Sequence, residues 1–287
     1  MLLSCLAKAT PHTLIGGDVE VNELRYNSRK VEKGDVFCCV VGTLADGHKY
    51  AAQAVEAGAA ALVVERQLDI DVPQVLVENT RIAMAEMAAA YYGNPADEMV
   101  MVGITGTNGK TSTSYMLKSI AERMGKKVGL IGTIRNMIGD IIIDTERTTP
   151  ESVDLQRILR QMKDENVDVV IMEVSSHSLD QKRVHGISYD IGCFTNLTQD
   201  HLDYHGTMEN YFDAKKELFR NCEKAVVCID DDYGKRFLNE LSVPVSTVSI
   251  GDISADFTAH DVKNYSDGCK FAMVGTGNIG RVNSSMP

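Results

Sequence analysis

A short polar stretch, TGTNGKT at residues 105–111, holds the residue types that proteins use to bind phosphate groups. Its glycines let backbone N–H groups approach an anion, Lys110 adds a mobile positive charge, and the Thr111 hydroxyl is placed to bind a magnesium ion that bridges phosphates. The strict pattern GxxxxGK[ST] fails, because it needs glycine where Ile104 stands. The stretch matches the shorter pattern GxxGKT, which out of context is often only a loop before a helix.

The sequence on both sides of this loop favours phosphate binding over a plain connection. Residues 100–104, VMVGI, form an apolar run that predicts a buried strand. After the loop, the apolar residues Met116, Leu117, Ile120 and Met124 fit the 3.6-residue period of an α-helix. A helix that starts directly after the loop directs its first N–H groups and the positive end of its dipole at the anion.

Two further clusters carry chemistry. Glu173 follows the apolar run 169–172, where a carboxylate costs free energy unless it is paired or bound to a metal ion. A strand-end acid beside a phosphate loop is typical of a second magnesium ligand, and the alternative is a hydrogen bond to a neighbouring loop. The stretch DHLDYH at 200–205 lacks the cysteine or histidine spacing of a zinc site. A magnesium or nucleotide role for one or two of its members is expected, unless its acids only cap local turns.

The composition limits the classes of function. A chain of 287 residues with 44% hydrophobic residues is long enough for two domains with sizeable cores. A formal net charge of −11 argues against a general nucleic-acid surface, and the lack of an apolar run of about 18 residues argues against membrane insertion. The seven cysteines form no CxxC pair, and Cys38, Cys39 and Cys228 lie in apolar runs. They predict small buried thiols in a reducing cytoplasm.

Alternating apolar strands and helices predict an α/β fold in two domains, divided at Gly93-Asn94-Pro95. The first, residues 1–94, is expected to be small, with strands at 36–41, 60–64 and 74–77 and helices at 50–57 and 81–92, the latter capped by Thr80. The second, residues 95–287, is expected to be a doubly wound, mainly parallel sheet with the phosphate loop.

The elements expected in this second domain are strands at 128–131, 167–174, 190–195, 225–229 and 245–250, a hairpin at 135–143, helices at 150–165 (capped by Thr149), 208–220 and 233–241, and antiparallel strands at 257–262 and 270–274. In such sheets ligands bind at the carboxyl ends of the strands. The polar clusters at 105–111, 173–177 and 196–205 all fall at such ends.

Taken in order, the motifs resemble those of the Mur ligases, ATP-dependent amide ligases of peptidoglycan synthesis. The motifs are GTNGKT at 106–111, TTP at 148–150, EVSSH at 173–177, TNLTQDHLD at 195–203 and AK at 214–215. In the first domain, NSR at 27–29, GDVF at 34–37 and ADG at 45–47 resemble the MurE type. That type adds the third amino acid to UDP-N-acetylmuramoyl-L-alanyl-D-glutamate.

The resemblance implies a role for each matching residue. The residues implied to bind ATP are Gly106, Thr107, Asn108, Gly109, Lys110, Thr111 and Ser112. Those implied to contact the UDP-sugar substrate are Ser28, Thr43, Leu44, Ala45, Thr148, Thr149, Ser175, Gln181 and Arg183. Thr111 and Glu173 would hold one Mg²⁺ ion and His201 a second. The implied catalytic residues are Lys110, His201 and Lys215, the last carried as a carbamate, an anion that can support a metal ion.

The implied reaction proceeds through an acyl phosphate on D-glutamate, which the amine of meso-diaminopimelate or L-lysine then attacks. The family's C-terminal domain binds this amino acid, and its motifs are missing here. We therefore expect an incomplete form with weak or no ligase activity, monomeric and cytoplasmic. Two alternatives stay open at this point: a folylpolyglutamate synthase-like ligase, which shares the loop, and a non-catalytic fragment that binds nucleotide or UDP-sugar.

Overall fold

The computed structural model describes residues 1–42, 45–145, 147–275 and 277–285. Its contacts separate two compact units, which are described one at a time. The first unit comprises Met1–Met99, Thr149–Asn166 and Ser178–Ile187, and the second comprises Val100–Thr148, Val167–His177 and Ser188–Pro287. The division at residue 94 stays a prediction, and the first unit takes in two segments from later in the chain. One of them supplies Val153 to the first unit's core.

The first unit is built on a five-stranded sheet with the order β1-β5-β4-β3-β2, parallel except for the β1–β5 pair. Its strands are β1 (Thr13–Ile15), β2 (Leu24–Arg25), β3 (Val36–Cys38), β4 (Ala61–Val64) and β5 (Gln74–Leu76). Its helices include α1 (Leu3–Ala7), α2 (Ala51–Glu56), α3 (Thr80–Tyr91) and α5 (Ser152–Asp164), with the short 3₁₀ turns η1 (Ser28–Lys30), η2 (Gly47–Tyr50) and η3 (Pro95–Glu98).

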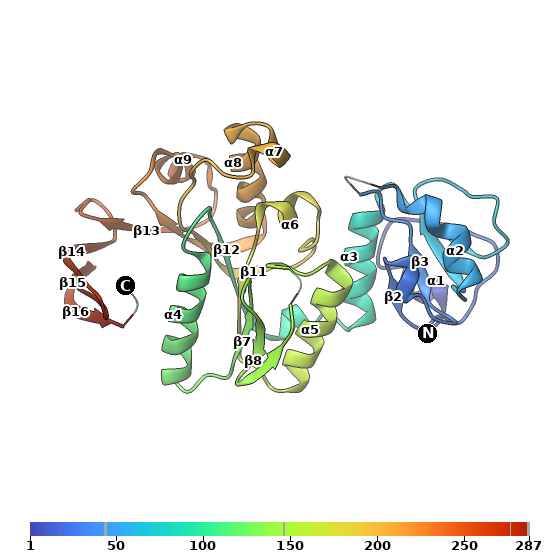
Figure 1. Ribbon diagram of the computed structural model, residues 1–287, viewed down its shortest axis with the longest axis horizontal. Coiled ribbons are helices and arrows are strands. Elements are labelled where there is room, and N and C mark those ends of the chain that lie inside the picture. The colour runs from blue at the N-terminus through green and yellow to red at the C-terminus, as the bar shows by residue number, and fades with distance from the viewer. Residues whose placement is uncertain (43–44, 146, 276, 286–287) are drawn as a thin grey trace. The chain divides into compact units, whose positions relative to one another are not determined.

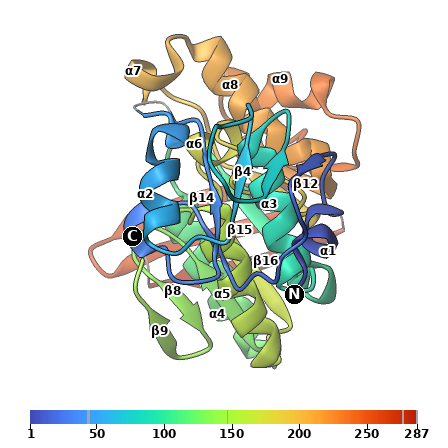
Figure 2. The same cartoon turned by 90° about the vertical axis from the view of Figure 1, so that its right-hand side faces the viewer.

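Alternation along β3 gives this unit two cores, because successive residues of a strand face opposite sides of the sheet. Val36 and Cys38 pack with α1 and α3, while Phe37 packs with α2 on the other face. In Figure 2, α2 lies on one side of the neighbouring strand β4, and α3 and α1 lie on the other. Cys38 and Cys39 are buried, as predicted, and burial raises the pKa of the Cys39 thiol to about 12. Cys228, in the second unit, is only half-buried.

Two of the expected helix caps are wrong by one or two residues. Helix α3 is capped by Asn79, whose side chain accepts from the N–H groups of Arg81 and Ile82, and Thr80 is already helical. Helix α5 has Glu151 at its N-cap position instead of Thr149. In the second unit, helix α8 ends at Lys216 and continues as a 3₁₀ turn.

The second unit contains an 11-stranded sheet with the order β16-β15-β14-β13-β12-β11-β6-β10-β7-β8-β9. Seven of these strands, from β14 to β7, form a parallel core, which confirms the doubly wound, mainly parallel sheet. They are β6 (Val100–Thr105), β7 (Val128–Ile131), β10 (Val169–Glu173), β11 (Tyr189–Phe194), β12 (Cys222–Cys228), β13 (Val245–Ile250) and β14 (Phe257–Tyr265). The helices are α4 (Lys110–Arg123), α7 (Leu202–His205), α8 (Met208–Lys216) and α9 (Asp232–Glu240), with the 3₁₀ turn η4 (Glu217–Asn221). The short helix α6 (Ser176–Asp180) has its first two residues in this unit and the rest in the first.

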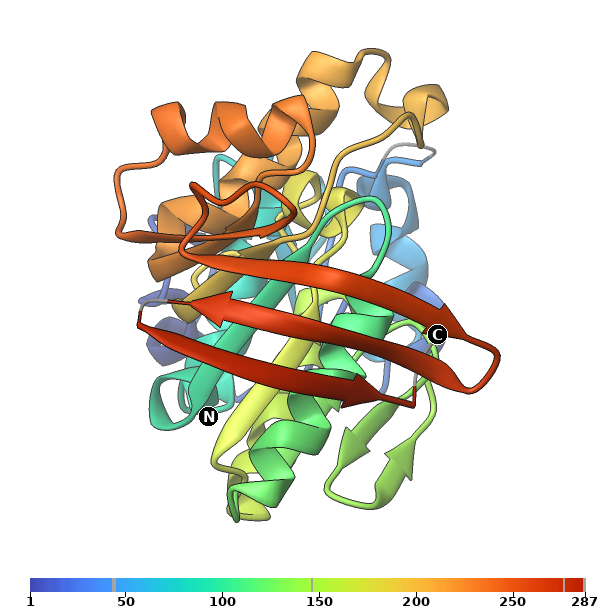
Figure 3. The same ribbon diagram turned by 90° about the vertical axis from the view of Figure 1, so that its left-hand side faces the viewer.

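Antiparallel strands flank the parallel core on both sides. The predicted hairpin is confirmed as β8 (Asn136–Ile138) and β9 (Ile141–Ile143), and β9 forms one edge, with Ile141 and Ile142 exposed. At the other edge, β14 pairs with β15 (Gly268–Gly275), as predicted, and a strand that was not expected, β16 (Asn278–Ser284), completes a three-stranded meander (Figure 3).

Helix α4 does not bury its whole apolar stripe. Leu117 packs on the sheet core, but the side chains of Ile120 and Met124 are 55% and 73% exposed. They line a cavity of about 570 Å³ between α4 and strands β6 and β10–β13. Figure 1 shows α4 beside β11 and β12. Within the described part of the chain, no helix has the length and hydropathy needed to cross a membrane.

Candidate active site

Three parallel strands end side by side and bring the polar clusters of the sequence together. Strand β6 lies between β10 and β11, with Ile104 opposite Glu173 and Thr105 opposite Phe194. The loop after β6, the acid at the end of β10 and the segment after β11 therefore lie side by side at the carboxyl ends of the strands. This confirms the expectation that these clusters meet at the carboxyl ends of the strands.

The loop after β6 packs closely on the segment after β11. Gly106 has a φ of +149°, and a Cβ there would collide with the Thr195 hydroxyl. The same hydroxyl donates to the carbonyl oxygen of Asn108 at 2.7 Å, and the Asn196 amide oxygen accepts from the Asn108 N–H at 3.0 Å. Gly109, with a φ of +85°, then occupies the N-cap of α4. The segment after β11 thus fixes the shape of the loop.

We expect Gly106→Ala to lower the thermal unfolding midpoint and to abolish binding of ATP, the nucleotide that the sequence resemblance implies. The new Cβ meets Thr195 in a backbone region that L-residues rarely adopt. Gly125→Ala is the matched control, because Gly125 has a φ of +78° and a Cβ there would meet no atom of the described residues within 4 Å. It carries backbone strain alone, about 1–2 kcal/mol. Equal midpoints and equal ATP affinity for the two variants would contradict the close packing.

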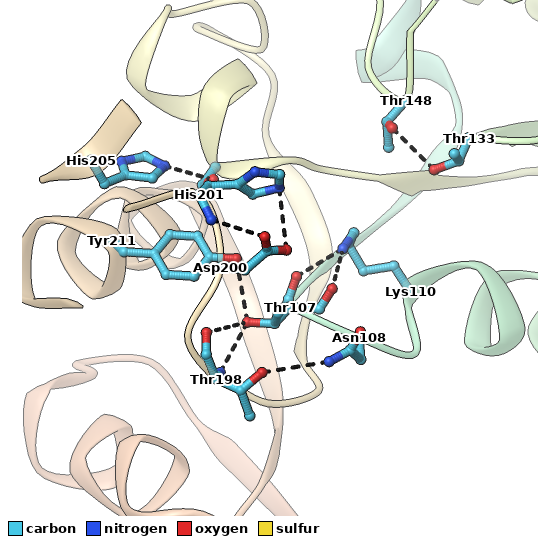
Figure 4. A network of polar contacts seen from close by, with 12 residues as sticks. Thr107, Asn108, Lys110, Thr133, Thr148, Thr198, Asp200, His201, His205 and Tyr211 are labelled. Atoms are coloured by element: carbon cyan, nitrogen blue, oxygen red, sulfur yellow. Dashed lines mark hydrogen bonds and ion pairs between the residues drawn. The ribbon is translucent and has the colours of Figure 1, made fainter. Parts of the chain in front are cut away.

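Two lysine side chains donate to one carbonyl oxygen of the loop. The Nζ atoms of Lys110 and Lys215 each lie 2.9 Å from the Gly106 carbonyl oxygen. Lys110 Nζ also lies 2.9 Å from the Thr107 carbonyl oxygen (Figure 4). Burial lowers the pKa of the Lys215 amine well below its ordinary value, and the charge of Lys110 lowers it further. A neutral amine is the nucleophilic form, so this environment suits the carbamate implied for Lys215.

Glu173 is almost fully buried, at 1% exposure, and is held by hydroxyl groups. Thr111 and Thr133 each donate a hydroxyl to Glu173 Oε2 at 2.9 Å, and the Thr133 N–H donates to Oε1 at 3.2 Å. The Thr148 hydroxyl lies 3.0 Å from that of Thr133 (Figure 4). Carboxylate and hydroxyl oxygens are the hard ligands that Mg²⁺ prefers. The donor set around Thr111 and Glu173 therefore fits the magnesium ion implied by the sequence.

His201 lies on the segment before α7, half-exposed. Its Nε2 is 3.4 Å from Asp200 Oδ2, and its ring centroid is 4.8 Å from that of His177. Among the described residues, no group of three or more His, Cys, Asp and Glu side chains could hold a metal ion. The role of His201 at a second magnesium ion stays a prediction.

The residues expected to bind the UDP-sugar divide between the two units. Thr148 and Ser175 belong to the second unit, and Thr43 and Leu44 lie outside the described residues. The members in the first unit are Ser28, Ala45, Thr149, Gln181 and Arg183.

Arg183 gathers two of these first-unit residues around its guanidinium group. It donates to the Thr149 carbonyl oxygen at 3.1 Å and to Gln181 Oε1 at 2.6 Å. Ser28 instead donates to Gln53 Oε1 at 3.3 Å, and Ala45 is exposed. The structure therefore brings Thr149, Gln181 and Arg183 together, and the remaining contacts with a UDP-sugar stay predictions.

Sequence analysis missed an arginine and a glutamate in the same unit. Glu151, which is 7% exposed, lies 3.0 Å from the Arg183 guanidinium and 3.7 Å from that of Arg81. Arg81 also donates to the carbonyl oxygens of Val41 and Gln181, at 3.2 and 3.3 Å. No motif marked Arg81, because its spacing reads as an ordinary helix surface.

Thr133 and Tyr211 were missed in the second unit. Thr133 follows the end of β7 by two residues, so the strand-end rule, applied to that strand, would have found it. Tyr211 carries no such signal, because it sits inside helix α8 and not at the end of a strand.

Two family models match the chain. The model described as Mur ligase family, catalytic domain, matches residues 20–92, and the model described as Mur ligase middle domain matches residues 104–287. The chain belongs to the Mur ligase family. The phosphate loop, Glu173 and Lys215 of this Mur ligase chain all lie within the second match.

Relatives of known name extend beyond the length of this chain. The UDP-N-acetylmuramoyl-L-alanyl-D-glutamate–2,6-diaminopimelate ligase of Clostridium tetani is 42% identical over 294 residues, which cover 100% of this Mur ligase chain and 60% of that protein. A solved structure of a ligase of the same name matches with a TM-score of 0.82 and 28% identity, over 93% of this chain and 56% of that one. The chain thus spans somewhat more than half the length of the relatives it matches.

A folylpolyglutamate synthase of Mycobacterium tuberculosis also matches, with a TM-score of 0.57 and 17% identity over 70% of this chain and 52% of that one. At this identity the likeness shows a shared fold.

Proposed function

We propose that this chain supplies the nucleotide and UDP-sugar sites of a MurE-type ligase. The proposed reaction uses ATP to join meso-2,6-diaminopimelate to UDP-N-acetylmuramoyl-L-alanyl-D-glutamate. One observation carries the proposal: Lys110, Lys215 and Glu173 meet around one phosphate loop. The 42% identity to a relative named for this reaction supports the choice of substrates.

In the proposed reaction, the D-glutamate γ-carboxylate attacks the γ-phosphoryl group of ATP, and ADP leaves. The amine of the incoming amino acid then displaces phosphate from the acyl phosphate. Lys110 would neutralise charge on the transferring phosphoryl group, which is where most catalysis of phosphoryl transfer comes from. Thr111 and Glu173 would hold Mg²⁺, which would supply positive charge against the negative charge of the phosphates. The carbamate of Lys215 and the imidazole of His201 would support a second ion.

The UDP-sugar would be held mainly by the first unit. Ser28 and Ala45 would contact the UDP part, and the cluster of Thr149, Gln181 and Arg183 would contact the muramoyl-dipeptide. The name of the Clostridium tetani relative favours diaminopimelate over L-lysine as the added amino acid. ATP and UDP-sugars are cytoplasmic nucleotides, so we place the reaction in the cytoplasm, with the chain as a monomer that binds neither nucleic acid nor membrane.

The proposal predicts that the chain binds UDP-N-acetylmuramoyl-L-alanyl-D-glutamate without ATP, because most of the residues expected to bind it belong to the first unit, whereas the phosphate loop belongs to the second. Isothermal titration measures this affinity. Arg183→Lys is expected to weaken it by about 10- to 150-fold, since lysine cannot replace the forked hydrogen bonds of arginine. Arg157→Lys is the control, because the Arg157 side chain is half-exposed on α5 and pairs with Asp154. This variant is expected to bind the UDP-sugar as the wild type does.

No binding of the UDP-sugar by folded wild-type protein would contradict the proposal. Binding of a folate in its place would favour the folylpolyglutamate synthase-like alternative. The fold alone does not decide between these two functions, because both kinds of ligase share it. Binding of both substrates without any UDP-sugar-dependent hydrolysis of ATP, in the presence of magnesium and bicarbonate, would favour the non-catalytic alternative.

A further inference from the structure

We infer that Tyr211 is a positioning residue for the phosphate loop. It completes the hydrogen bonding of Thr107 with its hydroxyl and holds Lys215 with its ring. The inference rests on the proposed function in one respect, namely that the ligand of the loop is ATP. The residue lies on α8, and its side chain is buried, at 1% exposure.

The hydroxyl of Tyr211 meets the loop at Thr107. The two oxygen atoms are 3.3 Å apart (Figure 4). Thr107 Oγ1 also accepts from the Thr198 N–H at 3.0 Å and donates to the Thr198 carbonyl oxygen at 3.2 Å. A threonine hydroxyl has one hydrogen to donate and two lone pairs. Because Thr198 takes the hydrogen and one lone pair, Tyr211 is the donor to the other.

The ring of Tyr211 contacts Lys215 and His205. Lys215 Nζ is 4.5 Å from the ring centroid, so the ring covers one side of the amine, and the same Nζ donates to the Gly106 carbonyl oxygen. The ring also stacks on His205, with 4.9 Å between the ring centroids and an angle of 26° between the ring planes. His205 Nε2 is in turn 2.9 Å from Ser176 Oγ. Tyr211 therefore connects α8 to α7 through His205. It also contacts the start of the loop, directly at Thr107 and through Lys215 at Gly106.

This arrangement does more than fill a core. A phenylalanine would fill the same space and keep the stacking, but it would leave Thr107 short of one donor. Gly106 and Thr107 are the residues whose carbonyl oxygens accept from Lys110. A shift of the loop at Thr107 therefore moves the acceptors of the lysine that would meet phosphate.

The first experiment measures hydrogen–deuterium exchange of the peptide covering residues 105–112, without nucleotide. Tyr211→Phe is expected to speed exchange there. Tyr189→Phe is the matched control, because Tyr189 is equally buried in the same unit but donates to Met172 Sδ, away from the loop. Exchange in Tyr211→Phe equal to that in Tyr189→Phe would overturn the inference, whatever the protein does with ATP.

The second experiment titrates ATP with magnesium. Tyr211→Phe is expected to weaken binding by about 2- to 12-fold, the range for one neutral hydrogen bond, while affinity for the UDP-sugar stays unchanged. In a Thr107→Val background the same change is expected to have no further effect. An equal further loss in that background would overturn the inference. If the wild type binds no ATP, the proposed function fails, and the exchange experiment still decides the role of Tyr211.

A third variant tests the ring. Tyr211→Leu removes it and is expected to expose Lys215, which is 1% exposed in the structure, to an amine-acylating reagent. Mass spectrometry of the labelled protein is expected to show protection of Lys215 restored in Tyr211→Phe. Equal labelling of Lys215 in the wild type and the leucine variant would overturn the part assigned to the ring.

Discussion

Replacing Lys110 with alanine is expected to raise the dissociation constant of ATP by about 100-fold or more, while the chain stays folded. A charge-assisted contact with phosphate contributes more than a neutral hydrogen bond, and the amine adds long-range attraction to the triphosphate. The fold is expected to persist because the Gly106 carbonyl oxygen keeps its second donor, Lys215. Isothermal titration with magnesium and ATP measures the change.

Lys118→Ala is the matched control for this variant. Lys118 lies on the same helix, two turns further along, and pairs with Glu122. Its loss removes the same charge from the same element but touches no part of the loop, so ATP affinity is expected to stay within about twofold of the wild type. An unchanged affinity in Lys110→Ala would mean that the loop was wrongly assigned.

Replacing Glu173 with glutamine is expected to remove the magnesium dependence of ATP binding. Glutamine has nearly the same shape and keeps hydrogen-bonding capacity toward Thr111 and Thr133, so the end of β10 should hold its place. It loses the negative charge. One charge near a cation at 4 Å is worth about 4 kcal/mol at an effective dielectric constant of 20, so at least a tenfold loss of ATP affinity in magnesium is expected.

The measurement compares ATP titrations in magnesium and in chelator for each protein. In the wild type the two affinities should differ, and in Glu173→Gln their ratio should fall to about one. Glu122→Gln, near the far end of α4, should keep the wild-type ratio. If Glu173→Gln also keeps it, Glu173 serves only as a hydrogen-bonded strand end, the alternative that the sequence left open.

Strands of the parallel core could be predicted closely, because a strand covered on both faces leaves a continuous apolar run. The short elements α1, β1 and β2 could not, since two to five residues carry no measurable period. Caps failed by a residue or two where cap-forming residues stand next to each other, as Asn79 and Thr80 do. Helix α4 shows another limit: periodicity marks its apolar side but does not say whether a neighbour covers it.

The site residues also divide into those that could be placed from the sequence and those that could not. Thr111 and Glu173 could be placed together because the loop before Thr111 follows β6 and Glu173 ends β10, and neighbouring parallel strands end side by side. The contact between Lys215 and the loop was not predictable from spacing, since α8 lies more than a hundred residues along the chain. Tyr211 belongs to the same helix. Contacts of this kind depend on how a late helix packs on an early loop, which no local pattern encodes.

Strand β9 leaves an edge of the large sheet open to other molecules, with Ile141 and Ile142 more than half exposed. Successive isoleucines at a sheet edge favour strand addition between chains and hence aggregation. Asp140 and Asp144 flank the triplet as gatekeepers, because two copies pairing along this edge would bring four carboxylates together. High salt screens that repulsion. Concentrated solutions of this protein should therefore aggregate most slowly in buffers of low ionic strength.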